Sequence, residues 1–217
     1  AILIQAACNY RVWILFVSYA ACFGIEIFIH NIAAMYYVDH FNMGLKEAGL
    51  TAGIFGLLAL FARALGGILS DKIAIKKGLD GRTTILFILI LCEGLFLILF
   101  SQMNTIGLAI ISMTVFALFT HMSCGATYAL VPFIDRNALG GVAGIIGAGG
   151  NVGAVAAGFL LKGMLDIQTC LMFLGGLVVI AASFVLMIRF SVEHKEKEQK
   201  LYEAAVLERN SVAEAQQ

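Results

Sequence analysis

The chain alternates between long apolar stretches and short polar ones along most of its length. Six of the apolar stretches are long enough to cross a bilayer as a helix, which takes about 20 residues. The predicted spans are 12–38, 48–70, 83–100, 105–131, 138–161 and 169–190. Because backbone N–H and C=O groups find no water in lipid, these spans must be α-helical. We therefore predict an all-α polytopic membrane protein with six transmembrane helices.

The composition supports a membrane protein over a soluble one. Apolar residues make up 61% of the chain and charged residues 13%, whereas soluble domains contain about 25% charged residues. The net charge is zero and no nucleic-acid-binding pattern occurs, so we expect no nucleic-acid partner. The five cysteines are dispersed without a CxxC pair, which favours apolar packing over a disulfide framework or a metal site. No cofactor is expected.

Lysine and arginine fall mainly on one side of the predicted membrane. Eleven of these residues lie in one set of loops and ends, against two in the other set. Cytoplasmic loops carry the excess of positive charge. We therefore expect a multi-pass protein of the plasma (cell inner) membrane with both termini in the cytoplasm.

The last part of the chain differs from the rest. Residues 191–217 are rich in Glu, Lys, Gln and Ala, which suits a polar helix or a solvated tail outside the membrane. We predict two regions: a transmembrane unit, 1–190, and a cytoplasmic C-terminal tail, 191–217.

Ionisable side chains inside spans are costly and therefore informative. Five occur: Glu26, His30, Arg63, Glu93 and His121. Arg63 lies deep in the second predicted span, and its planar guanidinium suits a planar oxyanion held by paired hydrogen bonds. The alternatives are that Arg63 extends to the cytoplasmic interface or pairs with an acidic residue. Glu93 and His121 are predicted to clamp neighbouring helices together.

The first span carries a second group of polar and aromatic residues. Tyr19, Phe23, Glu26 and His30 are spaced 4, 3 and 4 apart, which places them on one helical face. Such a face should line a cavity or another helix rather than meet lipid. Glu26 and His30 could pair, either as a structural clamp or as a proton or substrate site.

The fifth span contains a stripe of small residues. Its members are Gly140, Gly144, Gly147, Asn151, Ala154 and Gly158, and the stripe is widened by Gly149, Gly150 and Gly153. Small residues let helix backbones approach closely in lipid. We expect close packing against a moving neighbour here. Asn151 could bond a substrate or a partner helix, although packing alone would also explain the stripe.

Two motifs resemble those of a known transporter family. GGILSDK (66–72), followed by Gly81-Arg82, resembles the cytoplasmic loop motif of the major facilitator superfamily. GIIGAGGNVGA (144–154) resembles the second signature motif of its nitrate/nitrite porter family, and 131–144 looks like the approach to that motif. Residues 10–34 and 60–72 are similar to the seventh and eighth helices of that family.

The resemblance implies roles for particular residues. Arg63 matches one of two arginines that clamp the anion, and Tyr19 and Phe23 match an aromatic pair at the substrate. Glu26 and His30 resemble the assimilatory branch of the family more than its antiporter branch, and proton coupling could run through either residue. The implied signature residues are Gly144, Gly147, Gly149, Gly150, Asn151 and Gly153, and the implied loop motif is Gly67, Asp71, Lys72 and Arg82.

The family has twelve helices, whereas six are predicted here. We expect the chain to be one half of a major-facilitator fold, the C-terminal half, with an N-terminal six-helix half as its partner. The predicted function is nitrate or nitrite transport by alternating access, this chain carrying half of the site. A structural or regulatory membrane subunit, or a transporter of another small anion, are the alternatives. No nucleophile–base pair, HEXXH, P-loop or GxSxG pattern occurs, so an enzyme is not expected.

Overall fold

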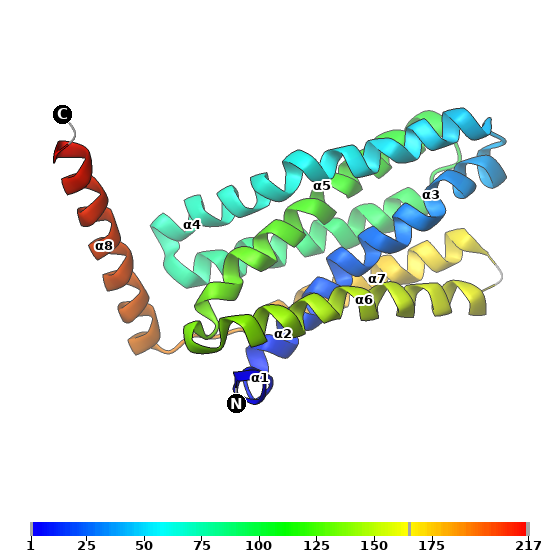
Figure 1. Ribbon diagram of the computed structural model, residues 1–217. Coiled ribbons are helices and arrows are strands. Elements are labelled where there is room, and N and C mark those ends of the chain that lie inside the picture. Colours follow the sequence, from blue (N-terminus) through cyan, green and yellow to red (C-terminus); the bar gives the residue numbers. More distant parts are fainter. Residues whose placement is uncertain (1, 165, 216–217) are drawn as a thin grey trace.

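The computed structural model describes residues 2–164 and 166–215, and within α8 the side chains as far as residue 208. The described part is a bundle of helices with a separate C-terminal helix (Figure 1). The α-helices are α1 (Ile2–Ala7), α2 (Tyr10–Tyr19), α3 (Ile25–Phe41), α4 (Leu45–Ser101), α5 (Ile106–Leu130), α6 (Leu139–Gly163), α7 (Ile167–Val185) and α8 (Val192–Ala215). A π-helix, η1 (Ala20–Gly24), and two 3₁₀ turns, η2 (Val131–Phe133) and η3 (Arg136–Ala138), complete them.

The first membrane span is one helical rod with a widened turn in it. Helices α2, η1 and α3 continue into one another over Tyr10–Phe41. The side chain of Asn9 accepts the backbone N–H of Arg11 at the start, and Asn42 ends the rod in a left-handed conformation with φ 51°. The predicted first span lies inside this rod. The π-helical turn, a feature that often marks functional positions, was not predicted.

Helix α4 contains the second and third predicted spans as two arms. Its 57 residues are helical except at Gly78, with φ 59° and ψ −146°, a conformation that glycine reaches readily because it has no Cβ. The chain turns back there, and the two arms run side by side (Figure 1). The predicted spans, 48–70 and 83–100, left residues 71–82 between them as a connection, and the structure has these residues helical except at Gly78, where a single glycine makes the turn.

Five helices among the described residues are long and apolar enough to cross a membrane, α4 being one of them. The described chain is helical and polytopic, as predicted, and the arms of α4 bring its passes to six. The six predicted spans appear as five helices, because the turn at Gly78 interrupts α4 by only one residue.

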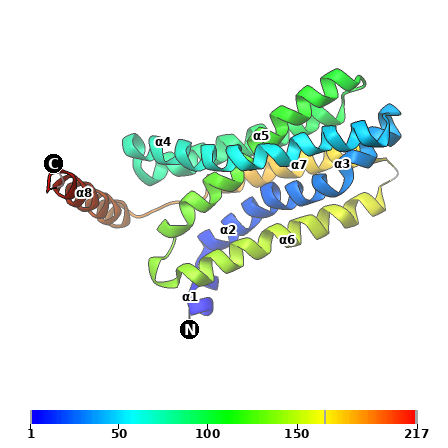
Figure 2. The same ribbon diagram turned by 45° about the horizontal axis from the view of Figure 1, so that its top comes forward.

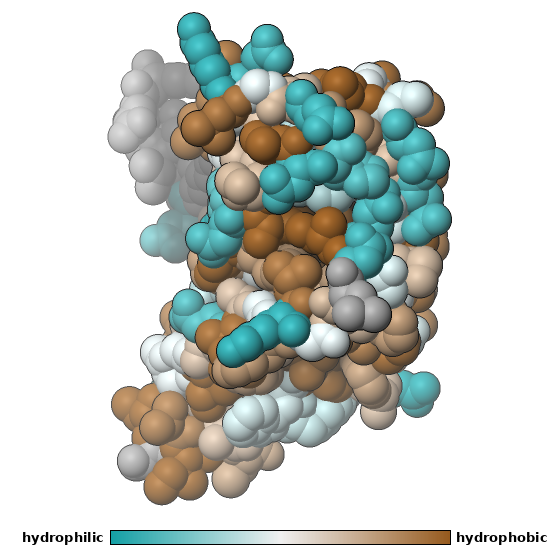
Figure 3. All heavy atoms as spheres, turned by 90° about the vertical axis from the view of Figure 1, so that its right-hand side faces the viewer, coloured by the Kyte–Doolittle hydropathy of each residue, from teal (hydrophilic) through white to brown (hydrophobic). Residues whose placement is uncertain are grey.

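The turns gather at two ends of the bundle. Those at 42–44 and 102–105, the end of α6 and the start of α7 lie at one end, and the Gly78 turn, the 131–138 segment and α8 lie at the other (Figure 1). Seen onto the first end, hydrophilic side chains cluster among apolar ones (Figure 3). The segments that carry most of the lysines and arginines counted above as one set are the Gly78 turn, the 131–138 segment and α8, so the charge asymmetry of the sequence becomes an asymmetry between the two ends (Figure 1).

The bundle is held together by close contacts between helix backbones. Helix α4 packs along α5 and α7, and α6 packs along α2 and η1 (Figure 2). A Cβ added at Gly66 would collide with the backbone of Met122, and one added at Gly125 with the carbonyl oxygen of Arg63. These two glycines therefore bring α4 and α5 together at the level of Arg63.

Candidate functional site

Arg63 and Glu26 form an ion pair in the interior of the bundle. One guanidinium nitrogen, Nη2, donates to both carboxylate oxygens of Glu26, at 2.7 and 2.6 Å. The Glu26 side chain is 7% exposed and the Arg63 side chain 37%. Of the alternatives predicted for Arg63, the structure thus shows the pairing with an acidic residue. The guanidinium nevertheless keeps donors to spare: its buried Nε has no hydrogen-bond partner among the described residues.

Glu26 is surrounded by further polar groups. Oε2 lies 3.3 Å from Nδ1 of His121 and accepts from the thiol of Cys124 at 3.6 Å. Oε1 lies 3.8 Å from Nε2 of His30. The predicted pairing of Glu26 with His30 is therefore the longest of these contacts, and Arg63 is the main partner. The ring of His30, 43% exposed, also packs edge-on against Phe55.

The protonation of His121 follows from its other contact. Its Nε2 lies 2.8 Å from the carbonyl oxygen of Phe55. A carbonyl only accepts, so Nε2 must carry a hydrogen. A neutral ring then turns the lone pair of Nδ1 toward the Glu26 carboxylate, and two acceptors repel each other. A hydrogen on Nδ1 or on the carboxyl oxygen would supply the missing donor.

Aromatic rings lie next to the ion pair. The guanidinium carbon of Arg63 lies 5.2 Å from the centre of the Phe23 ring. Tyr19 stacks on Phe23 at 5.0 Å, and Tyr128 meets Tyr19 edge-on at 5.0 Å. Phe23 thus offers its face to the cation. Tyr19, Phe23, Glu26 and Arg63, selected from two separate spans, come together as one cluster.

The glycines of α6 divide into a packed face and an open face. A Cβ at Gly150 would collide with Phe23, and Cβ atoms at Gly149 and Gly153 would collide with the backbone of Phe16 and Ala20. The close contact expected for this helix therefore lies on its face toward α2 and η1. Tyr128 reaches over Gly147, while nothing lies within 4 Å of a Cβ at Gly144.

Asn151 does not join the cluster. It is exposed and makes no side-chain hydrogen bond within the described residues. The interpretation of 140–158 as one packed stripe is corrected accordingly: Gly149, Gly150 and Gly153 make the contacts, and Gly140, Gly144 and Gly158 face open space. Asn151 lies on the open face of α6 with Gly144, where it is available to a partner rather than used inside this bundle.

The loop motif sits at the Gly78 end. Arg82 donates to Asp71 at 2.6 Å, contacts Ser70 at 3.3 Å and covers the Phe133 ring at 4.6 Å. The acid and the arginine of the motif therefore tie the two arms of α4 to each other and to η2. Lys72 is exposed, and nothing lies within 4 Å of a Cβ at Gly67.

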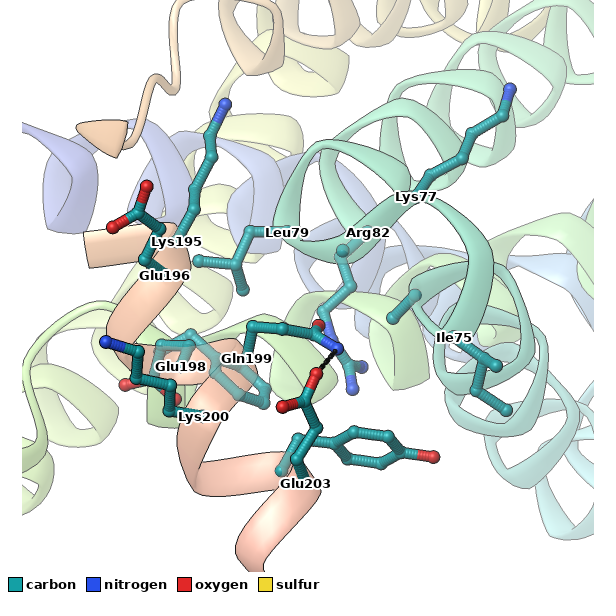
Figure 4. A pocket seen from close by; sticks show the side chains of 14 residues that line it. Ile75, Lys77, Leu79, Arg82, Lys195, Glu196, Glu198, Gln199, Lys200 and Glu203 are labelled. Atoms are coloured by element: carbon teal, nitrogen blue, oxygen red, sulfur yellow. Dashed lines mark hydrogen bonds between the residues drawn. The ribbon is translucent and has the colours of Figure 1, made fainter. Parts of the chain in front are cut away.

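A cleft opens at the same end between α8 and the turn of α4. It has a volume of about 510 Å³ and is lined by Lys77, Leu79 and Arg82 from α4 and by Gln199, Tyr202 and Glu203 from α8, among others (Figure 4). Two ion pairs hold α8 beside it. Arg136 donates through Nε and Nη2 to Glu198, the first contact at 2.9 Å, and Lys195 donates to Asp80 at 2.6 Å. The Arg136 guanidinium lowers the pKa of the Glu198 carboxyl, and the carboxylate raises the pKa of Arg136.

Sequence reasoning missed part of the Arg63 cluster. His121 was interpreted only as a clamp, and Cys124 and Tyr128 were not selected. Their spacing of 3 and 4 places the three on one face of α5, and that periodicity was the available signal. Glu93 and the cysteines belong to no sequence motif, so their positions in the bundle are known only from the packing of the helices.

Comparison with known proteins agrees with this architecture. The family model of the Major Facilitator Superfamily matches residues 12–215. The chain is similar to high affinity nitrate transporter 2.5 of Arabidopsis thaliana, 44% identical over 147 residues, which are 68% of this chain and 29% of that protein. No solved structure matches the chain.

Two further relatives carry related names. High-affinity nitrate transporter 2.3 of Oryza sativa subsp. japonica is 33% identical over 196 residues, 87% of this chain and 37% of that protein. Nitrate/nitrite transporter NrtP of Picosynechococcus sp. is 32% identical over 148 residues, 67% of this chain and 27% of that protein. The matched part of the chain thus spans about a third of the length of these curated relatives.

Proposed function

The chain belongs to the Major Facilitator Superfamily, and on that premise we propose that it forms half of a transporter for nitrate or nitrite. The relatives it matches are named for these anions. The observation that carries the proposal is Arg63, a cation inside the bundle that is 37% exposed and has an unused donor at Nε. A planar trigonal oxyanion can accept two parallel hydrogen bonds from such a fork.

Glu26 occupies Arg63 in the conformation described here. A carboxylate is itself a planar oxyanion, so a transported anion would compete with it for the guanidinium of Arg63. Neutralising Glu26 would release the guanidinium, since a protonated carboxyl is a much weaker partner for a cation. A proton passed from Nδ1 of His121 to the Glu26 carboxylate, 3.3 Å away, would provide that neutralisation. We therefore propose that anion binding at Arg63 and proton binding at Glu26 are coupled, with His121 rather than His30 as the nearer partner of Glu26.

The proposed site needs a second unit. Midplane sites of such transporters lie between two repeats that rock against each other. The open face of α6, with Gly144 and Asn151, offers a surface for the second unit. We propose that a further six-helix half covers this surface and supplies a second cation. We further propose that the Gly78 end, with its lysines and arginines, faces the cytoplasm and that both termini lie on that side of the plasma membrane.

One observation favours a second candidate function. Because Arg63 is already neutralised by Glu26, the pair could serve only to clamp α3 to α4 in a structural membrane subunit. Under that hypothesis the pair could be replaced by uncharged residues without loss of function.

The deciding experiment is uptake of labelled nitrate in cells without their own porters. The chain is expressed alone and together with an N-terminal six-helix half of a relative. We expect uptake only in the second case, abolished by Arg63→Ala and strongly reduced by Arg63→Lys, since lysine lacks the planar fork. Near-normal uptake by Arg63→Lys would contradict the proposed anion site and favour the clamp.

A further inference from the structure

Glu93 is a carboxyl sealed into the middle of the bundle. It lies in the second arm of α4, its residue is 0% exposed, and neither carboxylate oxygen has a hydrogen-bond partner within the described residues. The neighbouring residue, Gly94, packs directly on α7: an added Cβ would come within 2.9 Å of the Gly175 carbonyl oxygen. The packing therefore excludes water from this side.

The groups that face Glu93 offer no positive charge. The hydroxyls of Ser123 and Thr120 approach from α5. The titratable neighbours are Cys22 on η1, Cys124 on α5 and Glu26 on α3. On α7, the atoms nearest to an added Cβ at Gly94 belong to Gly175 and Val179. Among the described residues no ion pair includes Glu93, and Arg63 is used by Glu26.

An ionised carboxylate cannot be stable in these surroundings. Burying a charge without a partner is far more costly than burying a neutral polar group, and the nearby Glu26 carboxylate would add repulsion. A neutral carboxylic acid has one O–H to donate, and the Ser123 hydroxyl, itself without a hydrogen-bond partner, can accept it. We propose that Glu93 is a proton-binding site, occupied in this conformation.

The closed packing around Glu93 therefore requires the bound proton. Any conformation that closes the bundle around Glu93 must contain the proton, and any conformation that admits water lets the carboxyl ionise at neutral pH. If the chain transports an anion as proposed, each cycle of closing and opening binds and releases a proton here, at a position separate from the Arg63–Glu26 pair. This coupling rests on the proposed function, whereas the proton site itself does not.

Infrared spectroscopy of the purified chain in detergent micelles tests the proton site directly. A protonated carboxyl has a C=O band well separated from that of a carboxylate. We expect the protonated band at neutral pH in the wild-type chain, reduced in Glu93→Gln and shifted in Ser123→Ala, which removes the acceptor. Identical bands in wild type, Glu93→Gln and Ser123→Ala would overturn the proposal. If Glu93→Gln does not fold, Ser123→Ala alone decides.

Thermal unfolding as a function of pH gives a second readout. Because the protonated form of Glu93 is the one that packs, the unfolding temperature of the wild-type chain should fall as the pH rises through neutrality. Glu93→Gln, which stays neutral, should lose this fall, and Glu47→Gln, at an exposed position, should keep it. An unchanged pH dependence in Glu93→Gln would contradict a proton site. Neither experiment uses nitrate, so both can test the proton site even if the chain does not transport nitrate.

Discussion

Two ion pairs of the same length occur in very different parts of the molecule. Arg63 and Glu26 approach to 2.6 Å inside the bundle, and Lys195 and Asp80 approach to 2.6 Å between α8 and α4. The acid of the first pair is 7% exposed, and the acid of the second is 63% exposed. The two cations are equally exposed, at 37%, so the pairs differ in their acids: water and salt reach the Asp80 carboxylate freely and the Glu26 carboxylate hardly at all.

The difference shows why distance is a poor measure of importance. An exposed pair contributes about 0–1 kcal/mol to stability, because water screens it and its side chains lose freedom. A buried pair gains little over apolar packing, yet breaking it leaves an uncompensated charge. The interior pair is therefore expensive to keep and damaging to break, which fits a site retained for binding.

The largest effect is expected from removing the cation of the interior pair. Arg63→Ala leaves the Glu26 carboxylate buried without its main partner. Breaking a fully buried pair costs about 3–5 kcal/mol, and less is expected here because Arg63 is 37% exposed. Chemical unfolding of the chain in micelles measures the loss.

The double variant separates stability from function. Arg63→Ala with Glu26→Gln removes both charges, so the free energy of unfolding should return close to the wild-type value. Nitrate uptake by the assembled transporter should stay lost, because no cation remains to bind the anion. Recovery of uptake together with stability would show that the pair is only a clamp.

The same contrast explains how much could be predicted from the sequence. The spans are set by runs of apolar residues, and Tyr19, Phe23, Glu26 and Arg63 could be selected because polar groups in such runs are rare. Which of them pair is decided by how α3, α4 and α5 pack together. The crossing of α4 and α5 depends on Gly66 and Gly125 meeting backbone 56 or more positions away in the sequence. The periodicity of residues within one helix does not predict this contact between helices. The pairing of Glu26 with Arg63 and His121 was therefore not predictable.

That crossing can be disturbed by a single methyl group. Gly125→Ala places a Cβ against the Arg63 carbonyl oxygen, a contact with rigid backbone. Overpacking of this kind costs about 1–3 kcal/mol, and the displaced Arg63 should also weaken anion binding. Unfolding and nitrate-dependent stabilisation of the assembled transporter measure the two effects.

Gly53→Ala is the matched control on α4, the helix against which Gly125 packs. Nothing lies within 4 Å of a Cβ at Gly53, so alanine should stabilise the helix by about 0.5–1 kcal/mol. Equal losses in Gly53→Ala and Gly125→Ala would mean that the α4–α5 contact is not the cause.

At the α8 end, a smaller and pH-dependent effect is expected. The pKa of Glu198 is lowered by Arg136, so the pair stabilises the docked α8 at neutral pH, and the contribution is lost as the pH falls below the ordinary glutamate pKa of about 4.3. Glu198→Gln should remove up to about 1 kcal/mol, because Arg136 is 53% exposed. The rate of proteolytic cleavage within 192–208 should rise about fivefold at neutral pH.

Glu193→Gln serves as the control for this variant, since Glu193 is exposed at the start of α8. Its cleavage rate should match that of the wild type. A Glu198→Gln chain whose α8 is cleaved at the wild-type rate would mean that the Arg136 pair does not hold the helix.

The smallest effect is expected for the exposed pair of the comparison. Lys195→Ala removes the contact with Asp80, where both side chains are open to water, so the free energy of unfolding should change by about 0.2–1 kcal/mol in low salt and by less as salt screens the charges. A double-mutant cycle with Asp80→Ala isolates the coupling between the two side chains. The two contacts have the same length. A coupling energy as large as that between Arg63 and Glu26 would therefore mean that burial of the acid does not change the strength of the pair. A small coupling that vanishes in salt supports the distinction between a surface tether and an interior binding group.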